Sequence, residues 1–549
     1  MSNRFATIAL TILGSIIGVF ILFVVSLFLF PGVSLFGVKY IALNTHAGTT
    51  NKFSIQERVG NFTGIVLNTY EVPVYVIFSE EYSYEMEYVD NFNGLTSSKI
   101  ENPSYKIEKD DMGNAVISIS EFHTFIYESG NSQRYIKLYV PLKEVSTDRP
   151  GAVNLTINST RSAINFAKAE SSDSRIPRLY SVSIKTNGNV SYKDKVLAKT
   201  FEYETNNSIS IDETGTRSIV ADNYILTSNR GNIFVAQDVS GDLTLKTDQG
   251  KIAVRNCRNL TAETRYGDIY YNAIEKTDAD GNVVPDDGSI TVSGLVNINA
   301  KSGSVTLGDV TGGNGQNVIT TTSGNVKIKK IKDGSVTTQR GSVTIDSVRL
   351  FAVKTNSGKV NILEVTGNLD VETARGNINL GSDSKSVKDV KAFSRIGKIY
   401  IQSAVGTADI ETLSSDIRFI NTSEREFACK DLIVVCGGEL YAEGLIGKVK
   451  IKCEGNLNLS YSDLSEESTE IELGKNCTKA QINALSNFKD QINYVMIGKQ
   501  VNIQENQNNT IVTLETKDRY ELNVDSPYVF RISGENAVIN ICFKSQAEG

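Results

Sequence analysis

One phrase recurs between about residues 226 and 419: an apolar residue, any residue, Thr, two further residues, Gly, and then two apolar residues at alternate positions. Full copies occupy residues 245–254, 336–345, 353–362 and 371–380, and looser copies are centred on Gly231, Gly267, Gly288, Gly303, Gly324 and Gly397. The glycines are about 15 to 21 residues apart, and apolar residues alternate on either side of them. This pattern is typical of a coil of short strands. It predicts an all-β fold with a single β-solenoid, or parallel β-helix.

The phase of the repeat predicts which side chains point inward. The positions five before, two after and four after the Gly are apolar in nearly every copy, and residues two apart in a strand share a face. The Thr three before the Gly has the same phase, so these residues should stack inside a corner and bond neighbouring backbone. They are Thr247, Thr264, Thr321, Thr338, Thr355 and Thr373. The Gly column indicates a tight corner that needs positive φ or close backbone approach.

A second phrase, Val-Ser/Thr-Gly-Asp/Asn-Leu at residues 239–243 and 365–369, predicts a corner on the other side of the coil. Each rung should therefore contain at least two strands. Outward positions carry mixed chemistry, including the aromatic residues Phe234, Tyr270 and Tyr400. This mixture argues against a flat ladder of identical Thr residues, as an ice-binding surface requires. The aromatic residues are candidates for a carbohydrate or protein contact.

Five segments are expected: a short tail (1–5), a transmembrane helix (6–30), an amino-terminal β domain (40–150), the β-solenoid (151–465) and a carboxy-terminal β cap (466–549). Residues 6–30 carry no charged side chain, and this length can cross a bilayer as a helix. The apolar stretch is longer than that of a typical cleaved signal peptide. We therefore predict a single-pass protein of the cell membrane with most of the chain extracytoplasmic, although the flanking charges leave the orientation open.

The combined corner phrases in residues 239–254, Val-x-Gly-x-Leu-x-Leu-x-Thr-x-x-Gly-x-Ile-x-Val, resemble a bacterial adhesin-like β-strand-repeat family. That family is a domain of unknown function found in β-solenoid envelope proteins. The resemblance covers about residues 153–460, and its irregular upstream strands are similar to those ending near Pro141 here. It implies a β-solenoid and an adhesive role, and it implies no catalytic or binding residues.

The composition argues against some classes of function. The net charge of −7 and the isoelectric point near 5.3 give no general attraction to nucleic acid. The repeat contains no His and no clustered acids and bases, so we expect no enzymatic activity and no cofactor. The leading prediction is a non-enzymatic binding or scaffolding protein, attached to the membrane by its amino-terminal helix, whose ligand is a surface protein or a glycan. One alternative is a membrane-associated structural polymer similar to bactofilins; the oligomeric state stays open.

A further alternative is a calcium-dependent or carbohydrate-active β-helix protein. It rests on an acidic insertion that contains Asp278, Asp280, Asn282 and Asp286, which could supply oxygen ligands to Ca²⁺. The simpler interpretation is a solvated hairpin, because Asp-Gly-Asn readily forms a turn. We expect the hairpin.

Six cysteines are scattered through the chain, and most resemble small core residues. Cys429, Cys436 and Cys453 are close enough in sequence to lie on neighbouring rungs, where one disulfide is an open alternative. No Cys-x-x-Cys pair occurs and the chain has only His46 and His123, so zinc is not expected.

Overall fold

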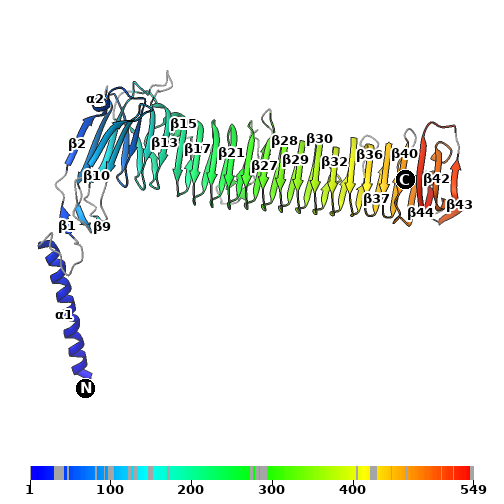
Figure 1. Cartoon of the computed structure of the whole chain (residues 1–549), viewed down its shortest axis with the longest axis horizontal. Coiled ribbons are helices and arrows are strands. Elements are labelled where there is room, and N and C mark those ends of the chain that lie inside the picture. The colour runs from blue at the N-terminus through cyan, green and yellow to red at the C-terminus, as the bar shows by residue number, and fades with distance from the viewer. Residues whose placement is uncertain are drawn as a thin grey trace. The chain divides into compact units, whose positions relative to one another are not determined.

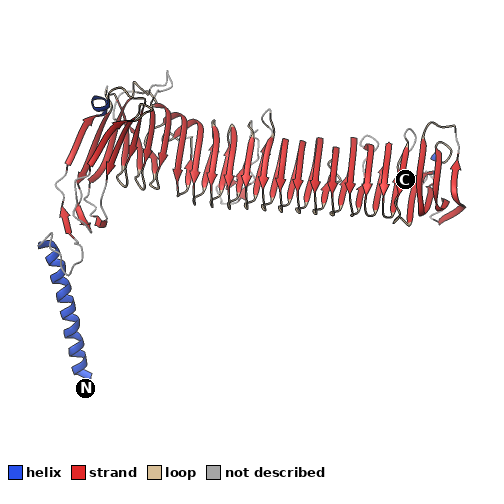
Figure 2. Cartoon of the chain, viewed as in Figure 1, coloured by secondary structure: helices blue, strands red, loops and turns tan. Residues whose placement is uncertain are grey.

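The structure is a computed structural model that forms two compact units, residues 1–228 and 229–549. It describes residues 2–29, 42–45, 49–80, 83–91, 93–96, 104–120, 125–128, 133–145, 153–169, 174–213, 215–272, 276–277, 283–284, 294–310, 312, 315–403, 406–420, 429–446, 448–463, 468–507, 510–522 and 525–544. Strands dominate both units (Figure 2), as the alternating pattern predicts.

Unit 1 begins with helix α1 (Ser2–Leu29), in the stretch where the apolar run predicts a helix. Over the part of the chain that the structure describes, no helix combines the length and the apolar character needed to cross a membrane. The helix predicted at residues 6–30 is therefore present, whereas its assignment as a transmembrane span is not supported.

The remainder of unit 1 is mainly β-structure. A three-stranded sheet contains β1 (Ala42–Thr45), β6 (Asn93–Thr96) and β9 (Phe125–Glu128). A six-stranded sheet has the order β14 (Val190–Tyr192), β12 (Ile164–Lys168), β4 (Val74–Ser79), β10 (Gln133–Pro141), β5 (Glu85–Asn91) and β2 (Thr49–Ser54). Ser54 caps the short helix α2 (Ile55–Val59) by accepting from the Glu57 backbone N–H.

Parallel pairing in unit 1 starts upstream of the repeat. Strand β11 pairs in parallel both with β3 and with β13, and β15 continues the series to β17. The strands of this series and its neighbours are β3 (Gly64–Asn68), β7 (Ser104–Lys109), β8 (Ala115–Ser120), β11 (Asn154–Asn158), β13 (Arg178–Lys185), β15 (Val196–Thr205), β16 (Ile209–Ile211) and β17 (Ile219–Ser228). Stacked parallel strands are thus shared by the irregular and the regular parts of the chain.

Unit 2 is a β-solenoid in which strands of two parallel series alternate along the chain (Figure 1). The first series starts with β18 (Ile233–Asp238), β20 (Ile252–Asn256), β22 (Ile269–Tyr271) and β26 (Val305–Val310). The second starts with β19 (Asp242–Thr247), β21 (Asn259–Thr264), β25 (Val296–Ala300) and β27 (Asn317–Thr321). This arrangement confirms the prediction of at least two strands in each rung.

Three long strands then carry both series: β28 (Val326–Thr338), β29 (Val343–Thr355) and β30 (Val360–Thr373). The first series continues with β31 (Ile378–Leu380), β33 (Ile399–Gln402), β35 (Ile417–Ile420), β37 (Leu440–Leu445), β39 (Leu457–Tyr461) and β41 (Lys479–Leu485). The second continues with β32 (Val387–Ser394), β34 (Gly406–Thr412), β36 (Cys429–Cys436), β38 (Lys448–Cys453) and β40 (Thr469–Leu473). Each strand pairs with the strand one rung away.

The inward columns lie where the repeat predicts them. Ile252, Ile269, Val343, Val360 and Ile378 belong to one column of buried residues, in which each strand is in register with the next. All six Thr residues of the corner column are buried as well. Five of these hydroxyls accept from the corner Gly N–H, at an N to Oγ1 distance of 3.0 Å in the copies at residues 247–250, 338–341 and 355–358. The Thr321 hydroxyl instead donates to the Gly324 carbonyl oxygen at 2.9 Å. The predicted phase and hydroxyl role of the Thr column are confirmed.

Close backbone approach, rather than positive φ, explains the Gly column. A Cβ atom on Gly250 would lie 1.9 Å from the Gly231 carbonyl oxygen, and one on Gly267 would lie 1.7 Å from that of Gly250. Positive φ occurs at other glycines, such as Gly334. The copy centred on Gly288 lies outside the described residues, and Gly303 stacks directly on Gly267. Among the described residues, Gly303 is therefore the corner that follows Gly267 in the column.

The carboxy-terminal strands of unit 2 are β42 (Asn493–Gln507), β43 (Thr510–Leu522) and β44 (Val529–Lys544), preceded by the 3₁₀ turn Ser486–Phe488. Strand β44 pairs in parallel with β40, β41 and β42. Strand β43 pairs with β42 in antiparallel orientation, with two register shifts. Among the described strands, β43 pairs with β42 alone, so its second edge is open.

Candidate functional site

One column of outward side chains runs along the first strand series of unit 2, three residues after each corner. We call it the outward column, and each member is in register with the next. Its members are Phe234, Ala253, Tyr270, Thr306, Lys327, Thr344, Asn361, Asn379, Tyr400, Arg418, Tyr441, Asn458 and Gln481. The mixed chemistry predicted for these positions is confirmed. Because the strands are parallel and in register, these side chains form a continuous strip, and one group of them contains two tyrosines and an arginine.

That group consists of Tyr400, Arg418 and Tyr441, and we call it the aromatic–arginine cluster. The three residues lie on adjacent strands, β33, β35 and β37. The Arg418 guanidinium is 5.9 Å from the centre of the Tyr400 ring and 5.2 Å from that of Tyr441. Such contacts between a cation and aromatic rings stabilise the guanidinium in a defined position. Arg418 is exposed and both tyrosines are half-buried, so the cluster faces solvent while its geometry is constrained.

Hydrogen bonds fix both tyrosine rings. The Tyr400 hydroxyl donates to Gln402 Oε1 at 3.3 Å, and the Tyr441 hydroxyl donates to Glu443 Oε2 at 2.8 Å. The bond to Glu443 and partial burial raise the pKa of Tyr441, because both disfavour the phenolate. The Tyr441 ring therefore presents a neutral phenol beside the Arg418 cation.

The row next to the outward column, one residue after each corner, holds the rungs together. Asn377 Oδ1 accepts from the Lys398 backbone N–H at 3.0 Å, and Asp416 Oδ1 accepts from the Glu439 backbone N–H at 3.1 Å. Lys398 Nζ lies 2.8 Å from Asp416 Oδ2 and holds the pKa of that carboxyl below its usual range. Asn456 Nδ2 donates to Glu439 Oε1 at 3.3 Å. The polar groups of this row are thus largely engaged with one another.

The two rows line an open depression of about 680 Å³ on strands β31 to β41. Amide side chains flank the aromatic–arginine cluster: Asn379 on one side, and Asn458 and Gln481 on the other. Amides present both donors and acceptors to a ligand. The depression therefore combines apolar rings and several amides with the cations of Lys398, Arg418 and Lys479.

The second strand series offers a contrast. Several of its outward cations pair with carboxylates of the next rung: Lys354 Nζ lies 2.8 Å from Glu372 Oε2, and Lys452 Nζ lies 3.2 Å from Glu472 Oε1. These are exposed pairs, which contribute little to stability. Arg418 lies between two rings instead, so its charge is not neutralised in this way.

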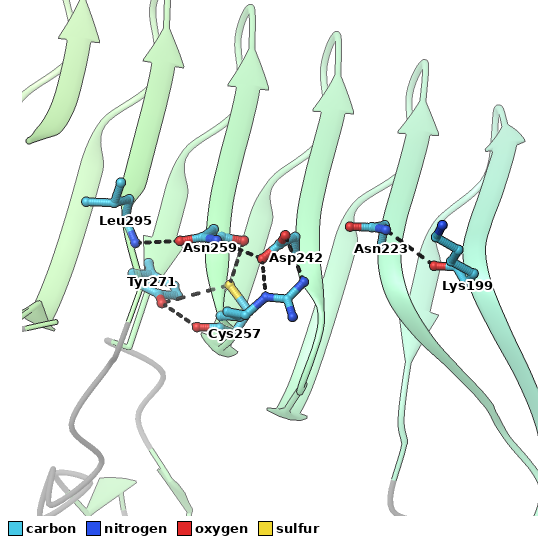
Figure 3. Close-up of polar contacts among 8 residues, drawn as sticks. Lys199, Asn223, Asp242, Cys257, Asn259, Tyr271 and Leu295 are labelled. Carbon is cyan, nitrogen blue, oxygen red and sulfur yellow. Dashed lines mark hydrogen bonds and ion pairs between the residues drawn. The ribbon is translucent and has the colours of Figure 1, made fainter. Parts of the chain in front are cut away.

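A second polar cluster lies at the other corner of the coil (Figure 3). Asp242 accepts two bonds from Arg258, from Nε at 2.8 Å and from Nη2 at 2.9 Å, and one from Asn259 Nδ2 at 2.8 Å. The bonds from Arg258 lower the pKa of Asp242. Asn259 Oδ1 accepts from the Leu295 backbone N–H at 3.0 Å. This cluster joins successive rungs, and its polar atoms are used within the fold.

Below this corner lie two buried side chains that also appear in Figure 3. The Tyr271 hydroxyl bonds to the Cys257 carbonyl oxygen at 3.5 Å and is 3.8 Å from Cys257 Sγ. Burial raises the pKa of the Cys257 thiol to about 12. The same view includes a bond within unit 1, from Asn223 Nδ2 to the Lys199 carbonyl oxygen at 3.4 Å. None of these groups is placed for nucleophilic chemistry, because the thiol stays protonated.

The acidic insertion contains a hairpin, as predicted: β23 (Lys276–Thr277) pairs in antiparallel orientation with β24 (Val283–Val284). The four candidate calcium ligands, Asp278, Asp280, Asn282 and Asp286, lie outside the described residues. Within the described ranges, no three His, Cys, Asp or Glu side chains come together in a way that could hold a metal ion. The calcium alternative stays a prediction that the geometry does not address.

All six cysteines are free and buried, so the disulfide left open among Cys429, Cys436 and Cys453 is not formed. Cys436 and Cys453 are in register on β36 and β38, where they occupy the Thr position of the corner column. Side chains stacked in this way have Cβ atoms about 4.8 Å apart, the spacing of strands, whereas a disulfide requires about 3.5 to 4.5 Å. A hydrogen bond with Cys453 lowers the pKa of Cys436, while burial raises that of Cys429 to about 12.

We expect the thiols to be unreactive in the folded protein. Ellman's reagent should label essentially none of the six cysteines under native conditions and all six in denaturant without reductant, because burial denies the reagent access. The measurement is absorbance after rapid mixing. Recovery of only four thiols in denaturant would reveal a bridge and contradict the stacking argument.

Sequence reasoning found Tyr400 as an outward aromatic residue but not its partners Arg418 and Tyr441. The corner before Arg418 has Ser415 in place of Gly, so the repeat phrase is interrupted there. The cluster could have been found by comparing the residues that lie three positions after the corner in successive rungs. Aligning those positions requires the length of each rung, which only the fold provides.

Comparisons with known proteins agree with this architecture. The family model of Toastrack DUF4097, a β-repeat domain of unknown function, matches residues 62–295 and 292–432. No curated protein and no solved structure matches the chain. The β-repeat domain of unknown function implied by the sequence resemblance is confirmed, whereas its adhesive role is not part of the match. Because the two matched segments cover more than half of the chain, the protein belongs to the Toastrack DUF4097 family.

Proposed function

We propose that this protein is a non-enzymatic binding or scaffolding protein of the cell envelope, and that the outward column carries its ligand surface. The observation that supports this most is the aromatic–arginine cluster, an exposed cation held between Tyr400 and Tyr441 in an open depression. A repetitive stack of strands displays such a surface without needing an enclosed cavity. The ligand is a surface protein or a glycan.

The proposal includes attachment to a membrane through helix α1. Ile8, Leu10 and Leu22 are 57%, 74% and 69% exposed, and apolar side chains between them are exposed on other sides of the helix. Exposed apolar surface costs about 25 cal/mol per Å² in water, which favours a lipid environment for this helix. Residues 6–30 also lack charged side chains. On this proposal most of the chain lies outside the cytoplasm.

The chemistry of the depression supports binding over catalysis. Its two carboxylates, Asp416 and Glu439, are engaged by Lys398 and by Asn456 respectively. No His occurs between residues 377 and 481. General acid–base catalysis needs a group with its proton free to transfer near the operating pH. Asp416 does not meet that need, because its pKa is lowered by Lys398.

A membrane-associated polymer of stacked coils is the second candidate, and one observation favours it. Strand β43 has an open edge, and Ile511, Val512 and Leu514 on it are exposed. Open edges promote pairing with another chain. The same strand, however, has register shifts and consecutive charged residues at 517–519, which are the features that protect natural edges. We therefore rank the polymer below the binding protein.

Protease treatment of intact cells tests the proposal. We expect an epitope tag at the carboxyl terminus to be digested, the full-length protein to float with membranes, and a variant lacking residues 2–29 to remain in the soluble fraction. A cytoplasmic membrane-bound protein serves as the control for cell integrity. Protection of the tag, together with filaments in the purified full-length protein, would contradict an external binding role and favour the polymer.

A further inference from the structure

The proposed binding role can be taken further at the same site, on which this inference rests. We propose that the aromatic–arginine cluster and its flanking amides bind an acidic polysaccharide laid along the rungs, with a sugar carboxylate paired to Arg418. Three features carry the proposal: the state of the Arg418 charge, the chemistry beside it, and the position of the site on a sheet face rather than at an edge.

The Arg418 charge is held ready for an external anion. Among the described residues, its guanidinium contacts the rings of Tyr400 and Tyr441 and forms no ion pair. Some arginines of unit 2 are paired instead: Arg258 forms a bidentate contact with Asp242, and Arg349 pairs with Asp333. A guanidinium matches a carboxylate with two parallel hydrogen bonds. Because the rings restrict the side chain beforehand, less conformational freedom is lost when an anion binds.

The groups next to Arg418 suit a sugar. Asn379, Asn458 and Gln481 lie in the same column, and a side-chain amide can both donate to and accept from neighbouring hydroxyls. Tyr400 and Tyr441 add flat apolar surface, against which the C–H faces of a pyranose ring can pack. The carboxylates nearby are engaged within the protein, Asp416 by Lys398 and Glu443 by the Tyr441 hydroxyl. An acidic ligand therefore meets Arg418 between its two rings, and Lys479, which lines the same depression, forms no ion pair among the described residues either.

The position on the sheet excludes one way of binding a peptide. A peptide that binds as an added strand needs an open sheet edge. Strands β33, β35 and β37, which carry the cluster, are paired on both sides. Their backbone groups are thus used in the ladders, and only side chains are offered. The depression extends over rungs spaced by about 4.8 Å, so an extended polymer can place successive sugars on successive rungs.

The test uses the full-length protein in detergent and three soluble probes: polygalacturonate as an acidic polysaccharide, dextran as a neutral one, and polyglutamate as an acidic peptide. We expect calorimetric titration to detect binding of polygalacturonate, with weaker or no binding of the other two. Arg418→Gln keeps hydrogen-bonding capacity but removes the charge, and it should weaken polygalacturonate binding by about tenfold or more. Lys452→Gln, on the second strand series, is the matched control and should bind as the wild type does.

Several results would overturn the inference. Equal binding of polygalacturonate by wild type and Arg418→Gln would show that a sugar carboxylate does not pair with Arg418. Equal affinity for dextran would show that charge is irrelevant, and equal Arg418-dependent affinity for polyglutamate would identify an acidic protein as the ligand. Failure of the wild type to bind polygalacturonate would also reject the assignment. Unchanged thermal unfolding of Arg418→Gln guards against a folding artefact. The proposed external binding role is judged separately, by protease accessibility, which uses none of these probes.

Discussion

Replacement of Gly341 by Ala should lower the free energy of unfolding by about 3 kcal/mol or more, a loss reserved for substitutions that break packing or strain the backbone. The new Cβ would lie 1.8 Å from the Gly324 carbonyl oxygen and 2.6 Å from its carbonyl carbon. Neither backbone can yield easily, because Val326 and Val343, just after these corners, are paired in the parallel ladder. The two rungs would have to separate, and the hydrogen bond from the Gly341 N–H to Thr338 Oγ1 would be strained.

Urea unfolding followed by circular dichroism measures the loss, and hydrogen exchange at residues 324–345 locates it. Gly215→Ala is the control, because a Cβ there meets no heavy atom closer than 3.6 Å. We expect that variant to change stability by at most about 0.5 kcal/mol. If Gly341→Ala behaved like the control, the corner column would have to tolerate a methyl group, and the explanation by close approach would be wrong.

Replacement of Phe419 by Ala should cost about 3 to 5 kcal/mol, the range measured for aromatic residues removed from cores. Phe419 is fully buried and lies on β35 between Ile401 of β33 and Ala442 of β37. The paired backbones on either side prevent the rungs from closing the cavity. Because each rung contacts only its neighbours, the damage should appear as increased hydrogen exchange in β33, β35 and β37 before it reaches distant rungs.

Leu413→Ala provides the matched control for Phe419→Ala. Leu413 belongs to the same rung region but is 53% exposed, so its removal should change the urea midpoint little. A large loss at Leu413 together with a small one at Phe419 would mean that the inward and outward assignments of this region are reversed.

The repeat in the sequence was enough to assign residues to the inside or the outside of the coil. The Thr-x-x-Gly phrase and its alternation were enough to place Thr338 and Thr355 inside the coil and Tyr400 outside it, and the structure agrees on all three. The reason is local, because successive side chains in a strand point to opposite faces. The face of one residue therefore fixes the faces of the others in that strand. The apolar run at residues 6–30 was likewise sufficient to predict a helix, although not the environment of that helix.

The order in which the rungs stack became visible only in the folded chain. Gly303 stacks on Gly267, whereas the repeat spacing alone predicted a further copy at Gly288 between them. The same stacking brings Arg418 between Tyr400 and Tyr441, and places Cys436 beside Cys453 without joining them. Rung lengths vary with their turns and insertions, and the contacts between rungs are long-range. Alternation along a strand specifies whether a residue faces inward or outward. Backbone pairing between complete rungs specifies which residues lie beside it, and the candidate site consists of residues brought together in this way.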